Sequence, residues 1–392
     1  MDDNHKGETS LGRQKVAIVT PGSFVIPSGR SSSVERVIEK VAPLVADQLD
    51  ISIYGTIGEG LSVEGNIGSV PCYRLPAGQH YADSVLSDLR QWLPKVIDVH
   101  NRPMLAYKLK QGLPRTKVLL TLHSTTFISP TQHPEMGIHQ MLNSLDGIIV
   151  NSQYLKNIII ERYPSLKMKT FVNHLGVSLE DFIPRWTTAG ESLRSARLVD
   201  LGWSDRKIVL YAGRLLPSKG VHHLLEAWPS IMSREPKSML LIVGSAFYSG
   251  DRETSYVRKL KSMAGPFGER VVFLPFVPYP QIAIWYNLAD VVAVPSNGEE
   301  AFGLVNVEAM ASAVPIVAAD NGGIPEIVEH GVSGHLIPTS AIVRGFTSSI
   351  LHLLGNEAER RRMGKSGREH VRSSFRWQHT ANRWKDLMTR EL

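Results

Sequence analysis

Short apolar runs rich in β-branched residues recur along the chain, and segments with helical spacing separate them. In the first half these runs cover residues 15–20, 51–56, 95–100, 117–123 and 147–152. Strands that alternate with helices are typical of βαβ units, in which a parallel sheet is buried on both faces. We therefore expect a doubly wound, Rossmann-like α/β domain over residues 15–185.

The pattern is interrupted by a polar stretch without a clear period, and it then restarts. The second series of apolar runs covers residues 207–214, 238–245, 270–277, 290–296 and 315–320. A chain of 392 residues also suits two domains. We expect a second domain of the same class over residues 186–374, with residues 1–14 as a disordered tail.

The last segment, residues 375–392, has helical spacing. Trp377, Trp384 and Leu387 recur at intervals that place them on one face of a helix. The spacing predicts a packing stripe rather than a cofactor site.

Composition limits the class of protein. Hydrophobic residues make up 43% of the chain and charged residues 20%, as in soluble globular proteins. No apolar run approaches the roughly 18 residues that span a bilayer, and the polar start is unlike a signal peptide, so we expect a cytoplasmic protein. Cys72 is the single cysteine, which excludes an internal disulfide.

Charge adds little to this picture. The net charge is +6, and residues 357–392 hold ten Lys and Arg against five Asp and Glu. Such a segment predicts a solvated helix face; weak peripheral contact with anionic membrane lipid is the alternative. The basic residues are not interleaved with aromatic ones, so we expect no nucleic-acid partner.

The first candidate site follows the run over residues 207–214. The chain continues as Leu-Leu-Pro-Ser between Arg214 and Lys219, and Gly220 precedes an apolar helical pattern. Because glycine permits a sharp turn, Arg214 and Lys219 can converge on one anionic group. A solvated basic loop is the alternative, but the preceding strand and Gly220 favour a diphosphate site.

The second candidate site follows the run over residues 290–296. Glu300 lies before a predicted helix start, and Glu308 lies about one and a half turns inside that helix. The free N–H groups of residues 302–304 form an anion site at the helix start. Glu300 can bind sugar hydroxyls, and Glu308 can bind a second set such as those of a ribose. A solvent-facing helical residue is the alternative for Glu308.

Together these motifs resemble the retaining glycosyltransferases of family 4. The matching residues are the Gly-Arg-x4-Lys-Gly loop (213–220), the Glu-x-Phe-Gly-Leu-x3-Glu signature (300–308) and Asn-Gly-Gly-Ile-Pro-Glu (321–326). The resemblance covers almost the whole chain. It implies the GT-B fold, in which two Rossmann-like domains face each other across a cleft and the terminal helix crosses back to the first domain.

The resemblance also implies a role for each residue of the motifs. Arg214 and Lys219 would hold the diphosphate of the donor. Glu300 would hold hydroxyls of the donor sugar as a catalytic residue, and Glu308 would bind the nucleotide ribose. The backbone at three residues would lie against sugar and phosphate: Phe302, Gly303 and Leu304. The glycines at 322 and 323 are interpreted as a tight turn before a helix.

Two strand ends in the first domain carry further candidates. His123 stands where the family has a histidine that enters the cleft near the sugar, and we expect it to act in catalysis; a core or loop histidine is the alternative. The tetrad 100–103 resembles a variant seen in spore-coat and surface-polysaccharide glycosyltransferases. The resemblance implies that His100, Asn101 and Arg102 line the acceptor side.

One position departs from the family pattern. The family usually has a Gly-Gly pair before the first long helix, and Ser32 and Ser33 stand in its place here. Serine keeps the N–H donors and can cap the helix, but it adds a side chain where glycine permits close approach. This departure leaves a non-catalytic coat or binding protein as an alternative to an enzyme.

These observations lead to one hypothesis about the reaction. The chain would transfer a sugar from a nucleotide-diphosphate donor, by default a UDP-sugar, to a hydroxyl acceptor of a bacterial surface or spore-coat glycan. Retention of configuration is taken from the family. No Asp-x-Asp element lies near the candidate donor site, so we expect no metal and no cofactor besides the donor. A sugar-nucleotide 2-epimerase is a further alternative, expected to lack the set of Arg214, Lys219 and Glu300.

Overall fold

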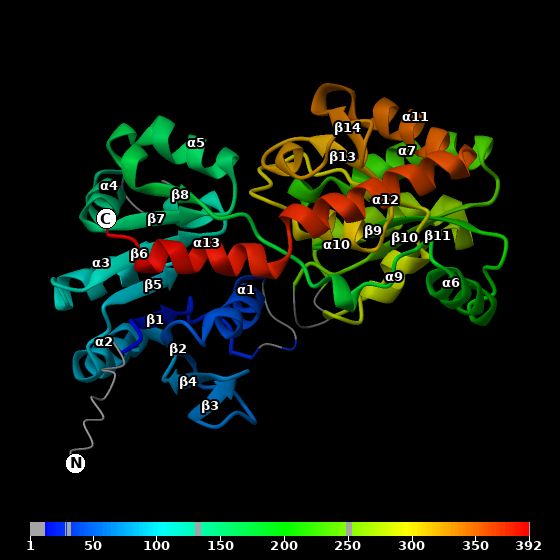
Figure 1. Ribbon diagram of the computed structural model, residues 1–392. Helices are drawn as coiled ribbons and strands as arrows, with labels where there is room; N and C mark the ends of the chain where they lie inside the picture. The colour runs from blue at the N-terminus through cyan, green and yellow to red at the C-terminus, as the bar shows by residue number, and fades with distance from the viewer. Residues whose placement is uncertain (1–11, 28, 30–32, 130–134, 248–252, 392) are drawn as a thin grey trace, which may run out of the picture.

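The computed structural model (Figure 1) describes residues 12–391 apart from residues 28, 30–32, 130–134 and 248–252. The described chain forms two sheets with helices packed on them, and every apolar run predicted above as a strand forms one. The expectation of two doubly wound α/β domains is therefore confirmed.

The first sheet has the strand order β3-β4-β2-β1-β5-β6-β7-β8. Its strands are β1 (Lys15–Val19), β2 (Asp50–Thr56), β3 (Glu64–Ile67), β4 (Val70–Leu75), β5 (Val96–His100), β6 (Lys117–Leu122), β7 (Gly147–Val150) and β8 (Thr170–Val172). The helices in this part of the chain are α1 (Ser33–Val41), α2 (Tyr81–Trp92), α3 (Pro103–Gly112), α4 (Glu135–Ser144) and α5 (Gln153–Arg162). Every residue of β5 and β7 is buried, as in a parallel sheet covered on both faces.

The second sheet has the order β11-β10-β9-β12-β13-β14, with parallel neighbours. Its strands are β9 (Lys207–Ala212), β10 (Ser238–Val243), β11 (Val271–Leu274), β12 (Val291–Val294), β13 (Ile316–Asp320) and β14 (Gly334–Pro338). The accompanying helices are α6 (Thr188–Asp200), α7 (Val221–Arg234), α8 (Ser255–Ala264), α9 (Ala283–Leu288), α10 (Leu304–Ala311), α11 (Ile342–Gly355) and α12 (Glu357–Ser374).

The last helix, α13 (Trp377–Thr389), returns to the first domain and appears in red beside α1 in Figure 1. The chain crosses over where Val177 pairs with Arg376. Trp377 and Trp384 are buried, and Leu387 is packed against the same core, so the predicted packing stripe is confirmed.

The structure also contains elements that the pattern did not predict. They are the short strands β3, β4, β8 and β14 and the helix α6. The strand β3 is antiparallel to β4, so the first sheet is parallel except at this edge. Helix α6 lies in the polar stretch that showed no period. Gly190 and Leu198 are its buried residues, which leaves too narrow an apolar stripe to detect.

Candidate active site

A cleft of about 890 Å³ lies between the strand ends of the two sheets. Strand β1 lies between β2 and β5, and β9 lies between β10 and β12, so each sheet reverses its winding there. Ligands of open α/β sheets bind at such points. Ten of the predicted site residues line the cleft: Asn101, Arg102, His123, Arg214, Lys219, Glu300, Phe302, Gly303, Leu304 and Glu308.

The loop after β9 brings the two predicted cations to the cleft. Gly220 has a φ of 69°, and a Cβ at this position would lie 1.9 Å from the carbonyl oxygen of Pro295, so a side chain does not fit. The hydroxyl of Tyr211 donates to the carbonyl of Arg214 at 2.7 Å and shapes the other end of the loop. Arg214 is exposed, and the side chain of Lys219 is 25% exposed. Both cations can therefore meet an anionic ligand.

Glu300 lies directly beside one of these cations. Its Oε2 contacts Nζ of Lys219 and accepts a 3.2 Å hydrogen bond from the hydroxyl of Ser296. The N–H of Gly323 donates to the Glu300 carbonyl at 2.8 Å, and a Cβ at Gly322 would lie 2.2 Å from that oxygen. The two glycines thus support the loop that carries Glu300, in agreement with their interpretation as a tight turn.

Glu308 is buried rather than solvent-facing, with 8% of its side chain exposed. Its Oε1 lies 3.1 Å from Nη1 of Arg36, and its Oε2 accepts a 2.8 Å hydrogen bond from the hydroxyl of Tyr286. Helix α10 begins after Gly303, whose φ is 84°. The ion pair joins α1 of the first domain to α10 of the second across the cleft.

Phe302 contributes to the core as well as to the cleft. Its side chain is 2% exposed, and its ring lies 6.0 Å from the rings of both His174 and Phe375. This packing fixes the segment that leads into α10, so the backbone of residues 302–304 is held at the edge of the cleft.

Asn101 and Arg102 follow β5 and hold other parts of the first domain in place. Asn101 has a φ of 55°, a left-handed conformation that asparagine tolerates, and its Oδ1 accepts a 2.8 Å hydrogen bond from the N–H of His123. Nε of Arg102 donates to the carbonyl of Pro21 at 3.1 Å, and its guanidinium lies 4.5 Å from the ring centre of Phe127.

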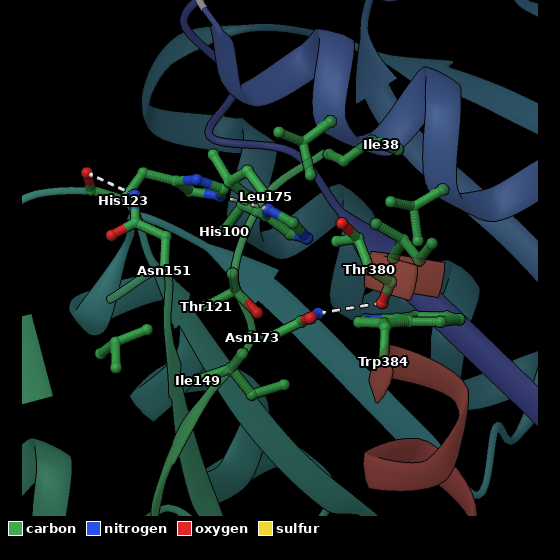
Figure 2. A pocket seen from close by; sticks show the side chains of 14 residues that line it. Ile38, His100, Thr121, His123, Ile149, Asn151, Asn173, Leu175, Thr380 and Trp384 are labelled. Carbon is green, nitrogen blue, oxygen red and sulfur yellow. Dashed lines mark hydrogen bonds between the residues drawn. The ribbon is translucent and has the colours of Figure 1, made fainter. Parts of the chain in front are cut away.

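His100 is the one predicted site residue that does not line this cleft. It is 4% exposed and lies behind His123, with its Nδ1 3.1 Å from Nε2 of His123. The expectation that it lines the acceptor side is therefore corrected, because β5 turns this side chain inward. Figure 2 shows both rings around a small pocket of about 20 Å³ that Trp384 closes on the far side.

Burial is the largest influence on the pKa of His123. Together with the neighbouring His100 it lowers this pKa to about 3, although Asp98 acts in the opposite direction. For Asp98, burial raises the pKa, but His100 and the hydrogen bonds from Thr121 and Trp384 lower it overall. The structure therefore holds a neutral His123 in front of an ionised Asp98.

Sequence reasoning missed four residues around this site: Arg36, Asp98, Tyr286 and Trp384. Asp98 interrupts an apolar strand, and that interruption is a signal of a buried partner. The position of Arg36 opposite Glu308 had no such signal, because the two residues belong to different domains.

The serines that replace the family's glycines are only partly described. Ser32 lies outside the described residues, and Ser33 is the first residue of α1. The effect of these serines on donor binding stays a prediction.

Several basic residues near the end of the chain pair with nearby acids. In α12, Arg361 pairs with Glu357 at 3.1 Å, and Arg362 pairs with Glu359 at 2.7 Å. This pattern favours a solvated helix face. Among the described residues, no helix is long and apolar enough to cross a membrane, and no group of His, Cys, Asp and Glu could hold a metal ion.

Comparison with known proteins identifies the family. Residues 199–370 match the model of glycosyl transferases group 1. The chain is 30% identical over 369 residues to YtcC of Bacillus subtilis (strain 168), a protein named as a glycosyltransferase, covering 94% of this chain and 90% of YtcC. The chain belongs to the group 1 glycosyltransferases. It is therefore an enzyme of the hexosyltransferase type, and that expectation is confirmed.

Two further comparisons describe this glycosyltransferase. It is 30% identical over 367 residues to spore coat protein SA of the same organism, covering 94% of this chain and 97% of that protein. In structure it resembles Anabaena HepE, solved in complex with UDP-glucose, with a TM-score of 0.77 and 21% identity over 96% of this chain and 99% of HepE. That likeness shows the GT-B fold, as expected.

Proposed function

We propose that this glycosyltransferase transfers a sugar from a UDP-sugar to a hydroxyl acceptor of a bacterial surface or spore-coat glycan, with retention of configuration. The observation that carries the proposal is the single cleft in which Lys219, Glu300, Glu308 and His123 meet. Supporting it, HepE binds UDP-glucose and has the same fold, and spore coat protein SA is a relative over most of its length.

The second domain supplies positive charge that stabilises the departing diphosphate. As the bond between sugar and diphosphate breaks, negative charge develops on the diphosphate. Arg214 and Lys219 stabilise this charge together with the N–H groups that precede α10. Once the donor is bound, the loops hold these cations and N–H groups in place, so little further reorganisation accompanies the departure of the diphosphate.

The two glutamates accept hydrogen bonds from the donor. Glu300 binds hydroxyls of the transferred sugar, and Glu308 binds those of the ribose. In the structure, Glu300 contacts Lys219 and Glu308 pairs with Arg36. Binding of the donor therefore exchanges contacts between protein groups for contacts to the ligand, and Lys219 is released towards the diphosphate.

The acceptor enters from the first domain, beside Asn101 and Arg102. No covalent nucleophile is required, because the acceptor hydroxyl attacks on the face from which the diphosphate departs and passes its proton to the departing diphosphate oxygen. Contacts across the cleft, such as the 2.6 Å hydrogen bond from Thr125 to Glu299, help the domains to exclude water, which would otherwise hydrolyse the donor.

A thermal-shift screen with turnover assays tests the proposal. The purified protein is heated with UDP, GDP, ADP, dTDP and their common sugars, and nucleotide release is then measured with candidate acceptors. We expect UDP and one UDP-sugar to raise the melting temperature, since a ligand of the folded state stabilises it. Arg214→Ala should abolish the shift, while the exposed, distant Lys259→Ala should retain it.

The outcomes separate the alternatives. Transfer that disappears in Glu300→Gln supports the proposal. A non-catalytic coat protein would release no nucleotide with any donor, and an epimerase would yield an altered UDP-sugar without transfer. A shift with GDP or ADP alone would overturn the choice of UDP.

A further inference from the structure

Away from the reacting groups, the carboxylate of Glu326 reaches from the second domain to the first. Glu326 ends the short turn Ile324–Glu326, which follows the two glycines described above. Its Oε2 accepts a 2.7 Å hydrogen bond from the N–H of Gln153 and lies 2.8 Å from Nε2 of His174. Its Oε1 accepts a 2.7 Å hydrogen bond from the N–H of Tyr154. The sugar-transfer steps above do not use Glu326.

The first turn of α5 depends on this carboxylate. A helix leaves its first N–H groups without partners inside the helix. In α5, the hydroxyl of Ser152 accepts from the N–H of Leu155 at 3.1 Å. The N–H groups of Gln153 and Tyr154 donate to Glu326 instead. A residue of the second domain therefore completes a helix of the first domain.

The surroundings keep Glu326 ionised. Burial raises the pKa of its carboxyl, but the hydrogen bonds from His174, Gln153 and Tyr154 lower this pKa overall. The start of a helix also favours a negative charge. An ionised carboxylate only accepts hydrogen bonds, so Nε2 of His174 donates to it. All three hydrogen bonds to Glu326 are therefore charge-assisted.

His174 is itself held firmly in the first domain. Its carbonyl accepts a 2.9 Å hydrogen bond from the hydroxyl of Thr380 and a 2.8 Å hydrogen bond from Nη2 of Arg383, both on α13. Its ring centre lies 6.0 Å from that of Phe302 and 5.9 Å from that of Phe375. Glu326 thus binds a segment that the last helix fixes in place.

This contact lies close to the supports of both sides of the cleft. In the second domain, the N–H of Gly323 donates to the carbonyl of Glu300. A Cβ at Gly323 would lie 3.0 Å from a side-chain carbon of the residue that caps α5, so the two domains approach closely here. In the first domain, Nδ2 of Asn151 donates to the carbonyl of His123 at 3.2 Å. A shift at this contact would therefore move Glu300 relative to His123.

We propose that Glu326 is a positioning residue, which docks the second domain on α5 and His174 of the first domain and thereby sets the spacing between Glu300 and His123. The inference rests on the proposed function in one respect, that both residues act on the same donor sugar. Glu326 is not among the residues that line the cleft, so it acts through these contacts and does not touch the donor.

The docking can be measured without donor or acceptor. Spin labels on Glu161→Cys and Arg344→Cys, at exposed positions of α5 and α11, report the spacing of the domains by double electron–electron resonance, since Cys72 is buried. We expect Glu326→Gln to broaden the distance distribution, because the amide sets an NH₂ group against one of the donors. The exposed Glu329→Gln is the matched control and should keep the wild-type distribution. An unchanged distribution in Glu326→Gln would overturn the inference, whether or not the proposed reaction is correct.

Kinetics separate positioning from donor binding. We expect Glu326→Gln to lower kcat about 10- to 100-fold, because a small misplacement of reacting groups has an effect of this size. UDP affinity, measured by calorimetry, should change by less than about twofold, since the proposed UDP contacts lie within the second domain. A loss of UDP affinity as large as the loss in kcat would contradict the inference. A wild-type protein that transfers no sugar would contradict the proposed function, while the distance measurement would still test the docking.

A second variant keeps the inference testable if Glu326→Gln does not fold. His174→Phe keeps a ring beside Phe302 and removes one of the three donors to the carboxylate. We expect kcat to fall about threefold to tenfold, the range of one hydrogen bond. In the double variant the second change should add little, because both residues act through one contact. An unchanged kcat in His174→Phe, or fully additive losses in the double variant, would count against the inference.

Discussion

The two walls of the cleft hold their functional groups in different ways. On the wall of the second domain, charged side chains are partly exposed and contact one another, as Lys219 and Glu300 do. On the wall of the first domain, His123 is neutral and backed by a buried hydrogen-bonded chain. In the proposed function, this difference lets the second domain exchange contacts between its own groups for contacts to a charged ligand, whereas the first domain keeps His123 in a fixed orientation.

The largest effect should come from the wall of the second domain. Glu300→Gln keeps the shape of the side chain but removes its charge and one acceptor. We expect kcat to fall about 10²- to 10³-fold, the range for loss of a group that stabilises the transition state. Steady-state assays of UDP release check this result, with the exposed Glu269→Gln as the control. A loss under about threefold would show that Glu300 is not a catalytic residue.

The next effect concerns the cation beside Glu300. Lys219→Ala removes the charge-assisted contact to the diphosphate that we propose, and it leaves Glu300 without its cationic partner. We expect UDP affinity to fall about 10- to 100-fold. Isothermal titration calorimetry measures the change, and Lys259→Ala is the matched control. Unchanged UDP affinity would show that Lys219 does not bind the donor, and the second domain would then not differ from the first in this respect.

The wall of the first domain should respond to pH, because it holds His123. The pKa of His123 is about 3 in the folded chain and about 6.5 when unfolded, so the unfolded chain binds a proton first as the pH falls. His123 therefore does not lower the free energy of unfolding above about pH 6.5, and this free energy falls progressively as the pH drops towards 3. We expect a loss of about 1–2 kcal/mol between pH 7 and pH 5.

Urea unfolding at several pH values measures this slope. His123→Gln should reduce the slope in that window, because glutamine does not titrate, while the lowered pKa values of His222, His335 and His379 keep part of it. An equal slope in the variant and the wild type would show that other groups dominate the acid response and that His123 is not held neutral by burial.

The smallest effect concerns the ion pair that joins the walls. In the proposed function Glu308 binds the ribose, and Arg36 then competes for it, so Arg36→Gln should tighten UDP binding by about two- to fivefold, the scale of a modest ion pair. Lys40→Gln is the control, since Lys40 lies on the same helix and pairs with Asp181 instead. Weaker UDP binding in Arg36→Gln would show that Arg36 contacts the donor itself.

Much of the site was predictable because its residues are close together in sequence. Lys219 and Gly220 share one loop, and Glu300 and Glu308 share one loop and helix. Their placement at strand ends followed from the apolar runs alone. Arg36 was not predictable in this way, because its partner Glu308 lies in the other domain and no local pattern links them.

The sequence by itself determined the strands that form the middle of each sheet, the loops at their carboxyl ends and the class of chemistry, because apolar periodicity and turn residues act over short distances. Only the tertiary structure decided that His100 faces inward to His123 and that Trp384, from the end of the chain, donates to Asp98. These contacts arise from packing between distant segments, where burial sets the charge of each group. For this reason a sequence motif can indicate candidate site residues, but it cannot indicate the charge or orientation in which the fold holds them.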